Sequence, residues 1–136
     1  MKVIGLTGGT GSGKSVVSRF LKEMGAVIVD ADLVSRQIVE VGKPAYEEIV
    51  AYFGKDILQE DGTIFRKKLG EIVFHDEEKL AFLNRCTHTY IVAEMKAQIE
   101  QAKAEGTASC IVLDAPLLFE VGLEKFCDAV WVVYAD

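Results

Sequence analysis

The stretch from Gly8 to Ser15 constrains this chain more than any other. It reads Gly-Gly-Thr-Gly-Ser-Gly-Lys-Ser and fits the pattern G-x-x-x-x-G-K-S/T without a mismatch. A triphosphate needs many hydrogen-bond donors in a small space. Backbone N–H groups can supply them where the residues are glycines, because without a Cβ the backbone can approach the anion closely. In this pattern the lysine reaches the β and γ phosphates and the serine hydroxyl faces Mg²⁺. The stretch therefore predicts a phosphate-binding loop, with Lys14 on the phosphates and Ser15 on the metal.

The flanking sequence supports this interpretation. Residues 3–6 are a short apolar run typical of a buried strand, and apolar residues recur at helical spacing from Val16 to Met24 before Gly25. Strand, loop and helix thus follow one another in the order that a phosphate loop requires. A glycine-rich turn without a ligand is the alternative, but such a turn has no need of lysine followed by serine.

Two acids follow the second apolar run, which covers residues 26–29. Asp30 and Asp32 are two residues apart, so on an extended strand end both carboxylates would point to one side of the sheet's carboxyl edge. Ligands of open α/β sheets bind at that edge. The alternatives are that Asp32 caps a helix and that Asp30 is a turn residue, and the spacing alone leaves both open.

Composition limits the partners of this chain. The 136 residues carry a net charge of −6 and are 50% hydrophobic, so we expect a globular protein without a surface for nucleic acid or an anionic membrane. Three widely spaced cysteines indicate free thiols rather than disulfides or a zinc site. No apolar run approaches the ~20 residues of a membrane span and no leader is recognisable, which predicts a cytoplasmic protein.

Residues 33–109 have a helical pattern throughout. This is far longer than the roughly dozen residues of a simple crossover between parallel strands, so we expect an inserted helical subdomain. An Asp61-Gly62 turn is expected within it. Helices are predicted from Pro44 to Gly54, from Asp76 to Cys86, and from about Thr87 to Gly106.

A third strand is predicted over residues 110–114 and a fourth over 129–134. The third ends in Asp114, a position from which a carboxylate can hold a metal through water. The loop from Pro116 to Glu120 would then cross the strand ends, where its apolar side chains either line a ligand pocket or pack beneath the loop. No helix follows the fourth strand, so we expect a truncated chain with an exposed sheet edge.

These parts suit phosphoryl transfer from ATP, where catalysis is mostly positioning and charge neutralisation. A switch GTPase is disfavoured because the sequence contains neither N-K-x-D nor D-x-x-G. A mechanical ATPase would show a glutamate beside its metal-binding aspartate, but Ala115 and Pro116 follow Asp114. A small-molecule kinase is therefore favoured, and a non-catalytic nucleotide-binding module remains the alternative.

Six motifs, in this order and spacing, resemble those of the dephospho-CoA kinase family: LTGGTGSGKS, DAD, GKPAYEEIVAYFG, DGTIFRKKL, THTYI and DAPLLFE. The resemblance covers the whole chain. It implies ATP- and Mg²⁺-dependent phosphorylation of the ribose 3′-hydroxyl of dephospho-CoA, the last step of coenzyme A synthesis. Another small-molecule kinase is the alternative. The resemblance also implies a helical substrate domain and a mobile lid with phosphate-facing arginines, although all four arginines here precede residue 86. We therefore expect this polypeptide to turn over slowly or not at all.

The resemblance also implies roles for individual residues. Asp32 would be the general base on the acceptor hydroxyl, Lys14 would act on the phosphates, and Asp114 would hold Mg²⁺ through water together with Ser15. ATP would bind to Thr10, Gly11, Ser12, Gly13, Lys14, Ser15 and Val16. Besides Asp32, the residues that would contact or shape the acceptor site are Arg66, His88, Leu117, Leu118, Phe119 and Glu120. For His88 the alternative is a capping or packing role within the helical domain. The sequence departs from the family pattern at Phe65, Thr89 and Val92.

The predicted fold is a three-layer α/β P-loop NTPase core like that of nucleoside monophosphate kinases. Its parallel sheet would have the strand order 2-3-1-4. The nucleotide-binding core would comprise residues 1–32 and 110–136, and the helical substrate-binding insertion residues 33–109. The sequence predicts no oligomeric state.

Overall fold

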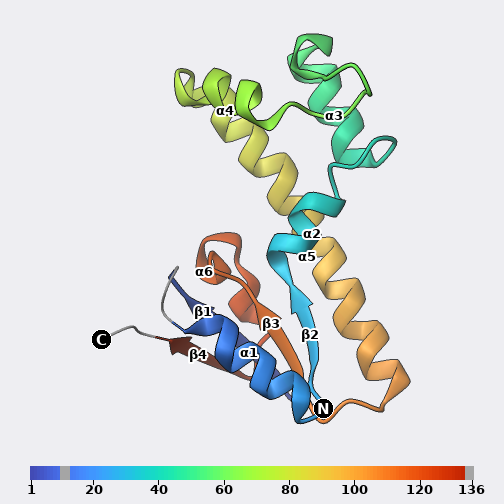
Figure 1. Cartoon of the computed structure of the whole chain (residues 1–136), viewed down its shortest axis with the longest axis vertical. Coiled ribbons are helices and arrows are strands. Elements are labelled where there is room, and N and C mark those ends of the chain that lie inside the picture. Colours follow the sequence, from blue (N-terminus) through green and yellow to red (C-terminus); the bar gives the residue numbers. More distant parts are fainter. Residues whose placement is uncertain (10–12, 134–136) are drawn as a thin grey trace. The chain divides into compact units, whose positions relative to one another are not determined.

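A computed structural model describes residues 1–9 and 13–133 of the chain (Figure 1). The chain divides into two compact units, one formed by Met1–Val34 with Val92–Asp136 and the other by Ser35–Ile91. The first unit contains the sheet. The second is mainly helical, and each unit is described separately below.

Four parallel strands form the sheet of the first unit, in the order β2-β3-β1-β4 that the sequence predicts. Their register places Asp114 beside both Leu6 and Asp30, so strands that are far apart in sequence end together at one edge. The strands are β1 (Val3–Gly8), β2 (Val27–Asp30), β3 (Ile111–Asp114) and β4 (Ala129–Val133).

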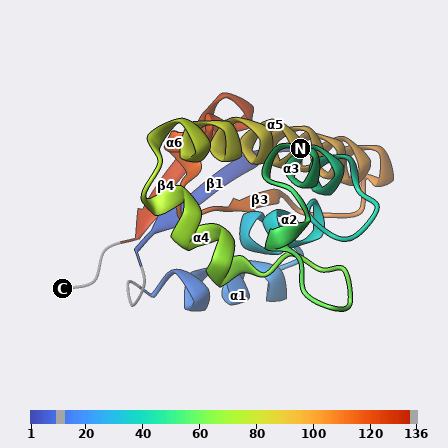
Figure 2. The same ribbon diagram turned by 90° about the horizontal axis from the view of Figure 1, so that it is seen from above.

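Helices cover both faces of this sheet, which makes the three layers expected (Figure 2). On one face α1 (Lys14–Glu23) packs Val17 and Leu21 against a buried cluster of Leu6, Ala26 and Val112. On the other face lies the C-terminal half of α5 (Glu77–Glu105). The central strand β3 is buried along Ile111–Leu113, as a parallel strand covered on both sides should be.

Gly5 of β1 lies where the chain packs too closely for a side chain. A Cβ at this position would stand 2.8 Å from the Cys127 Sγ and 2.9 Å from a Leu118 methyl carbon. Since Leu118 is fully buried, it has little room to move. The close approach also explains why the loop and short helix α6 (Leu118–Val121) sit directly on the strand.

We expect Gly5→Ala to destabilise the protein by about 1–3 kcal/mol, because overpacking forces side chains and backbone to shift. Urea unfolding followed by circular dichroism measures the change. Gly70→Ala is the control: Gly70 lies inside α4 with nothing near its missing Cβ, so alanine should stabilise by about 0.5–1 kcal/mol. Equal stabilities of Gly5→Ala and the unmodified protein would contradict the packing argument.

The second unit is built from short helices around a small core. It contains the C-terminal end of α2 (Ala31–Gln37), with α3 (Pro44–Phe53), α4 (Arg66–Phe74) and the N-terminal half of α5. The start of α3 at Pro44 and its end before Gly54 agree with the sequence prediction. The buried side chains include Tyr46, Ile49, Ile57, Leu69 and Val73.

The prediction of two helices between Asp76 and Gly106 is wrong, because α5 is one helix of 29 residues. Asp76 does cap it, accepting hydrogen bonds from the Glu78 and Lys79 amides at 3.1 Å each. Thr87, the expected start of the second helix, donates its hydroxyl to the Leu83 carbonyl one turn earlier. A threonine satisfied in this way continues a helix rather than ending it.

Because α5 is continuous, the helical unit ends earlier in the chain than the sequence predicts. The sequence suggested an insertion over 33–109, whereas the compact helical unit comprises Ser35–Ile91. Residues 92–109 belong to the sheet-containing unit, where Met95, Ile99 and Ala102 are buried. The helical periodicity of the sequence therefore predicts that the insertion is helical, but it does not indicate which part of the last helix packs on the sheet.

A search of the helices in residues 1–9 and 13–133 finds none with the length and apolar character of a membrane span. The cysteines are free thiols, and burial raises the pKa of both Cys86 and Cys127, so they are poor nucleophiles near neutral pH. Strand β4 pairs with β1 alone among the described residues, and Trp131 on it is 44% exposed.

Candidate functional site

A hollow of about 430 Å³ lies at the carboxyl edge of the sheet, entirely within the first unit. The described residues that line it are Gly8, Gly9, Gly13, Lys14, Ser15, Asp32 and Pro116. The structure thus brings the phosphate-loop residues together with Asp32, as the sequence predicts. Thr10, Gly11 and Ser12, also expected on the nucleotide, lie outside the described residues.

Gly13 sets the start of α1 beside this hollow. Its φ of 93° is in the left-handed region, which glycine adopts without strain. The Gly13 carbonyl accepts hydrogen bonds from the amides of Val16 at 3.1 Å and Val17 at 3.2 Å. The first turn of α1 contains no acidic residue, so its positive end favours an anion. The Val16 side chain is 59% exposed and does not line the hollow.

Lys14 and Asp114 form an ion pair inside the site. The Lys14 ammonium donates to a carboxylate oxygen of Asp114, and the two side chains are only 16% and 13% exposed. Asp114 is the last residue of β3, so the parallel register fixes its carboxylate at the strand end. The pair joins the end of β3 to the start of α1 and places a cation and an anion side by side at the edge of the sheet.

The two acids after β2 are placed differently from the prediction. The strand ends at Asp30 and α2 begins at Ala31, so Asp32 lies in the first helical turn rather than on an extended strand end. Asp30 caps this helix: its carboxylate accepts from the amides of Asp32 at 2.9 Å and Leu33 at 3.3 Å. The capping role considered for Asp32 thus belongs to Asp30, and Asp32 reaches the hollow from the helix.

Two hydrogen bonds join the loop after β3 to the end of β1. Thr7, which is only 7% exposed, donates its hydroxyl to the Pro116 carbonyl at 3.2 Å, and the Ala115 amide donates to the Leu6 carbonyl at 3.0 Å. These contacts hold Pro116 on the wall of the hollow. Thr7 is not among the site residues predicted from the sequence, although a threonine at the end of an apolar strand is a signal for such a role.

The other loop residues were expected either to line a ligand pocket or to pack beneath the loop, and the structure differs from one residue to the next. Leu118 is fully buried against Gly5, so it packs beneath the loop and the prediction of a ligand contact is wrong for it. Leu117 and Phe119 are each 54% exposed, and Glu120 is exposed as well. Leu117, Phe119 and Glu120 are accessible, but none of them lines the hollow.

Arg66 and His88 lie in the second unit. Arg66 is the first residue of α4 and lines a separate pocket of that unit, whereas His88 is half-buried on α5 and does not line it. Arg36 and Asn84 line the same pocket as Arg66 and were not singled out from the sequence. They come from different helices, and only the folded chain brings them together.

The oxygen groups of the hollow suit a small hard cation held mainly by a nucleotide. Within the described residues no three His, Cys, Asp or Glu side chains gather as a complete metal site. Mg²⁺ bound with a nucleotide needs only one or two protein ligands, since phosphates and waters supply the rest. Ser15 lines the hollow and Asp114 is paired with Lys14, which also lines it, and both side chains offer oxygen ligands of that kind.

Comparison with known proteins gave one consistent result. The family model described as dephospho-CoA kinase matches residues 2–136. A dephospho-CoA kinase of Carboxydothermus hydrogenoformans is 49% identical over 134 residues, which are 98% of this chain and 65% of the relative. One from Bacillus cereus is 50% identical over 131 residues, 96% of this chain and again 65% of the relative. This chain thus spans 65% of the length of these curated relatives.

Solved structures give the same picture. The dephospho-CoA kinase of Campylobacter jejuni matches with a TM-score of 0.78 and 29% identity, covering 97% of this chain and 65% of that one. The protein TT1252 of Thermus thermophilus also matches with a TM-score of 0.78, at 27% identity over 99% of this chain and 66% of that one. The α/β fold with its helical insertion is therefore shared with these proteins.

Proposed function

Because this chain belongs to the dephospho-CoA kinase family, we propose that it acts in ATP-dependent phosphorylation of the ribose 3′-hydroxyl of dephospho-CoA. The observation that carries this proposal is the hollow at the sheet edge. There Lys14 and Ser15 of the phosphate loop face the same space as the carboxylate-bearing residue Asp32. A site for the phosphoryl donor and a carboxylate that can receive a proton would thus lie in one place.

Each group has a defined part in the proposed transfer. Asp32 takes the proton of the acceptor hydroxyl as its oxygen forms a bond to the γ-phosphorus of ATP. The bond from that phosphorus to the β–γ bridging oxygen breaks, which leaves ADP. Lys14 and the amides at the start of α1 stabilise the negative charge on the phosphates.

Ser15 and Asp114 would hold Mg²⁺, Asp114 through water. The ion would neutralise charge on the phosphate oxygens when bound. Asp114 lies against Lys14, so the same carboxylate also orients the ammonium group.

The remaining residue roles complete the proposal. Thr10–Ser15 and Val16 would bind ATP, and Arg66, His88, Leu117, Phe119 and Glu120 would contact or shape the acceptor site. We propose a cytoplasmic location, where both ATP and coenzyme A intermediates are available. The charge of −6 makes nucleic acid an unsuitable partner.

Incubation with ATP, Mg²⁺ and dephospho-CoA tests the proposal directly. Because slow turnover is expected from the sequence, the incubation is long; we then expect ADP and a product heavier than dephospho-CoA by one phosphoryl group, which chromatography with mass spectrometry detects. Calorimetric titration with ATP and with dephospho-CoA separately measures the two affinities. A protein that binds ATP but neither binds nor phosphorylates dephospho-CoA would be a nucleotide-binding module or a kinase of another acceptor.

A further inference from the structure

Among the described residues, Thr7 has the one buried aliphatic hydroxyl, and the residue is only 7% exposed. It lies in β1, a strand whose other residues are apolar or glycine. Valine has nearly the same shape and suits a strand equally well. Because a hydroxyl that is buried without a partner is unfavourable, a threonine at this position requires a hydrogen bond.

The partner is the carbonyl of Pro116, which accepts from the Thr7 hydroxyl at 3.2 Å. One residue earlier, the Ala115 amide donates to the Leu6 carbonyl at 3.0 Å. Proline has no N–H, so Pro116 cannot donate a backbone hydrogen bond to β1. The Thr7 side chain therefore extends the attachment of this loop by one residue, to a residue that lines the nucleotide hollow.

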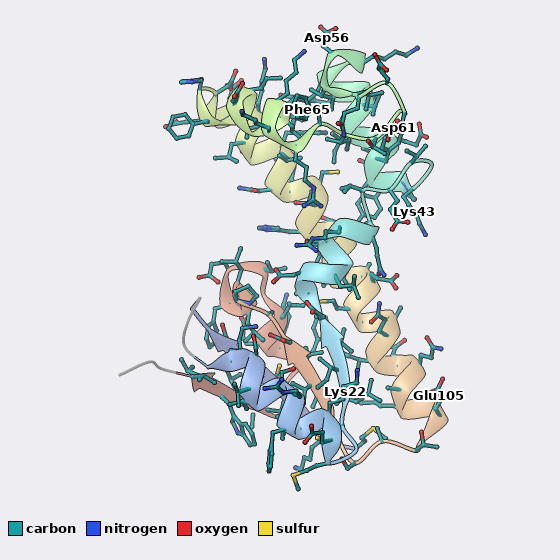
Figure 3. The ribbon with its side chains drawn as sticks, viewed as in Figure 1. Lys22, Lys43, Asp56, Asp61, Phe65 and Glu105 are labelled. Atoms are coloured by element: carbon teal, nitrogen blue, oxygen red, sulfur yellow. The ribbon has the colours of Figure 1, made fainter. Side chains whose placement is uncertain are left out.

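The same face of β1 holds the loop at a second point. Leu6 packs against α1, the helix that carries Lys22 in Figure 3. Neighbouring residues of a strand point to opposite faces, so Gly5 and Thr7 both face away from α1. Leu118 lies on that opposite face, where Gly5 leaves space for it. Two residues of one strand thus determine where the loop after β3 lies.

Thr7 also stands immediately before the phosphate loop. Gly8 and Gly9, the next two residues, line the hollow, and so does Pro116. One residue thus connects two parts of the lining, because its backbone continues into the glycines and its hydroxyl holds the loop that carries Pro116. Without this hydrogen bond the two parts could move relative to each other. A displacement of about 1 Å between reacting groups can cost about 100-fold in rate.

We infer that Thr7 is a positioning residue for phosphoryl transfer, which acts through Pro116 by fixing the loop after β3 relative to the phosphate loop. The inference rests on the proposed function, because it concerns a reaction in the same hollow. Thr7 itself does not line the hollow, so no contact with a substrate is required. The residue lies outside the G-x-x-x-x-G-K-S/T pattern, which begins at Gly8.

Thr7→Val tests the inference, because it removes the hydroxyl and keeps the shape of the side chain. The single-turnover rate at saturating ATP and dephospho-CoA should fall by about 10- to 100-fold. ATP affinity, measured by calorimetric titration, should stay within about threefold, since the backbone donors of the phosphate loop are retained.

Thr7→Ser is the conservative variant that should rescue the rate. It keeps the hydroxyl, so its single-turnover rate should lie within about threefold of that of the unmodified protein. It also loses a buried methyl group, which should lower the melting temperature. A merely structural role of Thr7 would make the rate follow the stability, whereas the inferred role makes the rate follow the hydroxyl.

Ser109→Ala is the matched control. The Ser109 hydroxyl donates to the Met24 carbonyl, also at 3.2 Å, but this bond lies before the start of β3 and neither residue lines the hollow. The variant loses a hydrogen bond of the same kind, so the single-turnover rate should stay within about threefold.

Hydrogen–deuterium exchange measures the loop without requiring turnover. The amides of Ala115 and Val121 donate to the carbonyls of Leu6 and Leu117, so they should exchange slowly while the loop stays in place. Thr7→Val should accelerate their exchange by about tenfold or more, because the loop opens more often. Thr7→Ser should leave their exchange unchanged.

The outcomes separate this inference from the proposed function. If the unmodified protein phosphorylates dephospho-CoA and Thr7→Val does so at the same rate, the inference is wrong and the proposed function stands. Unchanged exchange of the loop amides in Thr7→Val would also overturn the inference. If the loop exchanges faster in Thr7→Val but the unmodified protein transfers no phosphoryl group, the proposed function fails, and the fixing of the loop by Thr7 stands.

Discussion

Asp32→Asn is expected to lower the rate of phosphoryl transfer to dephospho-CoA by about 100- to 10,000-fold, the usual contribution of a positioned general base. Asparagine has nearly the shape of aspartate but cannot take the proton of the acceptor hydroxyl. Asp32 lines the hollow together with Lys14 and Ser15, so a substrate held there would lie beside this residue. The affinity for ATP should remain within about twofold, because the groups assigned to the phosphates are untouched. Single-turnover rates and calorimetric titration with ATP measure the two quantities separately.

Asp30→Asn is the matched control for this experiment. It makes the same chemical change two residues away, at the residue whose carboxylate caps α2. Asparagine is as good an N-cap as aspartate, so we expect the helix to persist and the transfer rate to change by less than about tenfold. A rate for Asp32→Asn close to that of the unmodified protein would remove the general base from the mechanism. An equal loss in both variants would mean that the orientation of α2, not the Asp32 carboxylate, was affected.

Features governed by local sequence could be predicted. The strands of the sheet are continuous apolar runs such as Val27–Val29, because strands covered on both faces contain few polar positions. The start of α3 at Pro44 and its end before Gly54 follow from the fixed φ of proline and the left-handed backbone that glycine tolerates. The phosphate loop could be predicted because its function restricts nearly every residue type from Gly8 to Ser15.

Features decided by tertiary contacts could not be predicted. Leu117 and Leu118 are identical in type, yet only Leu118 is buried, because Gly5 leaves space above β1 for it. Asp30 and Asp32 have the same capping ability, and which of them caps α2 depends on a shift of the helix start by two residues.

The pocket of the second unit shows the same limit at longer range. Arg36 and Asn84 line it together although α2 and α5 are far apart in the sequence. No periodicity within either helix could have indicated this. The sequence was thus most informative about the phosphate loop and least informative about the acceptor contacts.

Lys14→Met is expected to weaken ATP binding by about 10- to 100-fold, because a charge-assisted contact to the phosphates is lost. The transfer rate should fall by a further 100- to 1,000-fold or so, as it does when one donor to a developing negative charge is removed. Methionine keeps the length and the apolar part of the side chain, so the packing of α1 should survive. Arg19→Met, on the exposed side of the same helix, is the control and should leave ATP affinity within about twofold.

The ion pair with Asp114 allows the effect on binding to be separated from an effect on stability. Lys14→Met leaves the Asp114 carboxylate, which is only 13% exposed, without its cation, and we expect this to reduce the free energy of unfolding by about 1–3 kcal/mol. The double variant Lys14→Met with Asp114→Asn removes the stranded charge and should regain most of that stability. It should not regain ATP affinity, because the phosphates would still lack the lysine. Recovery of ATP binding in the double variant would show that Lys14 serves to neutralise Asp114 rather than to hold the nucleotide.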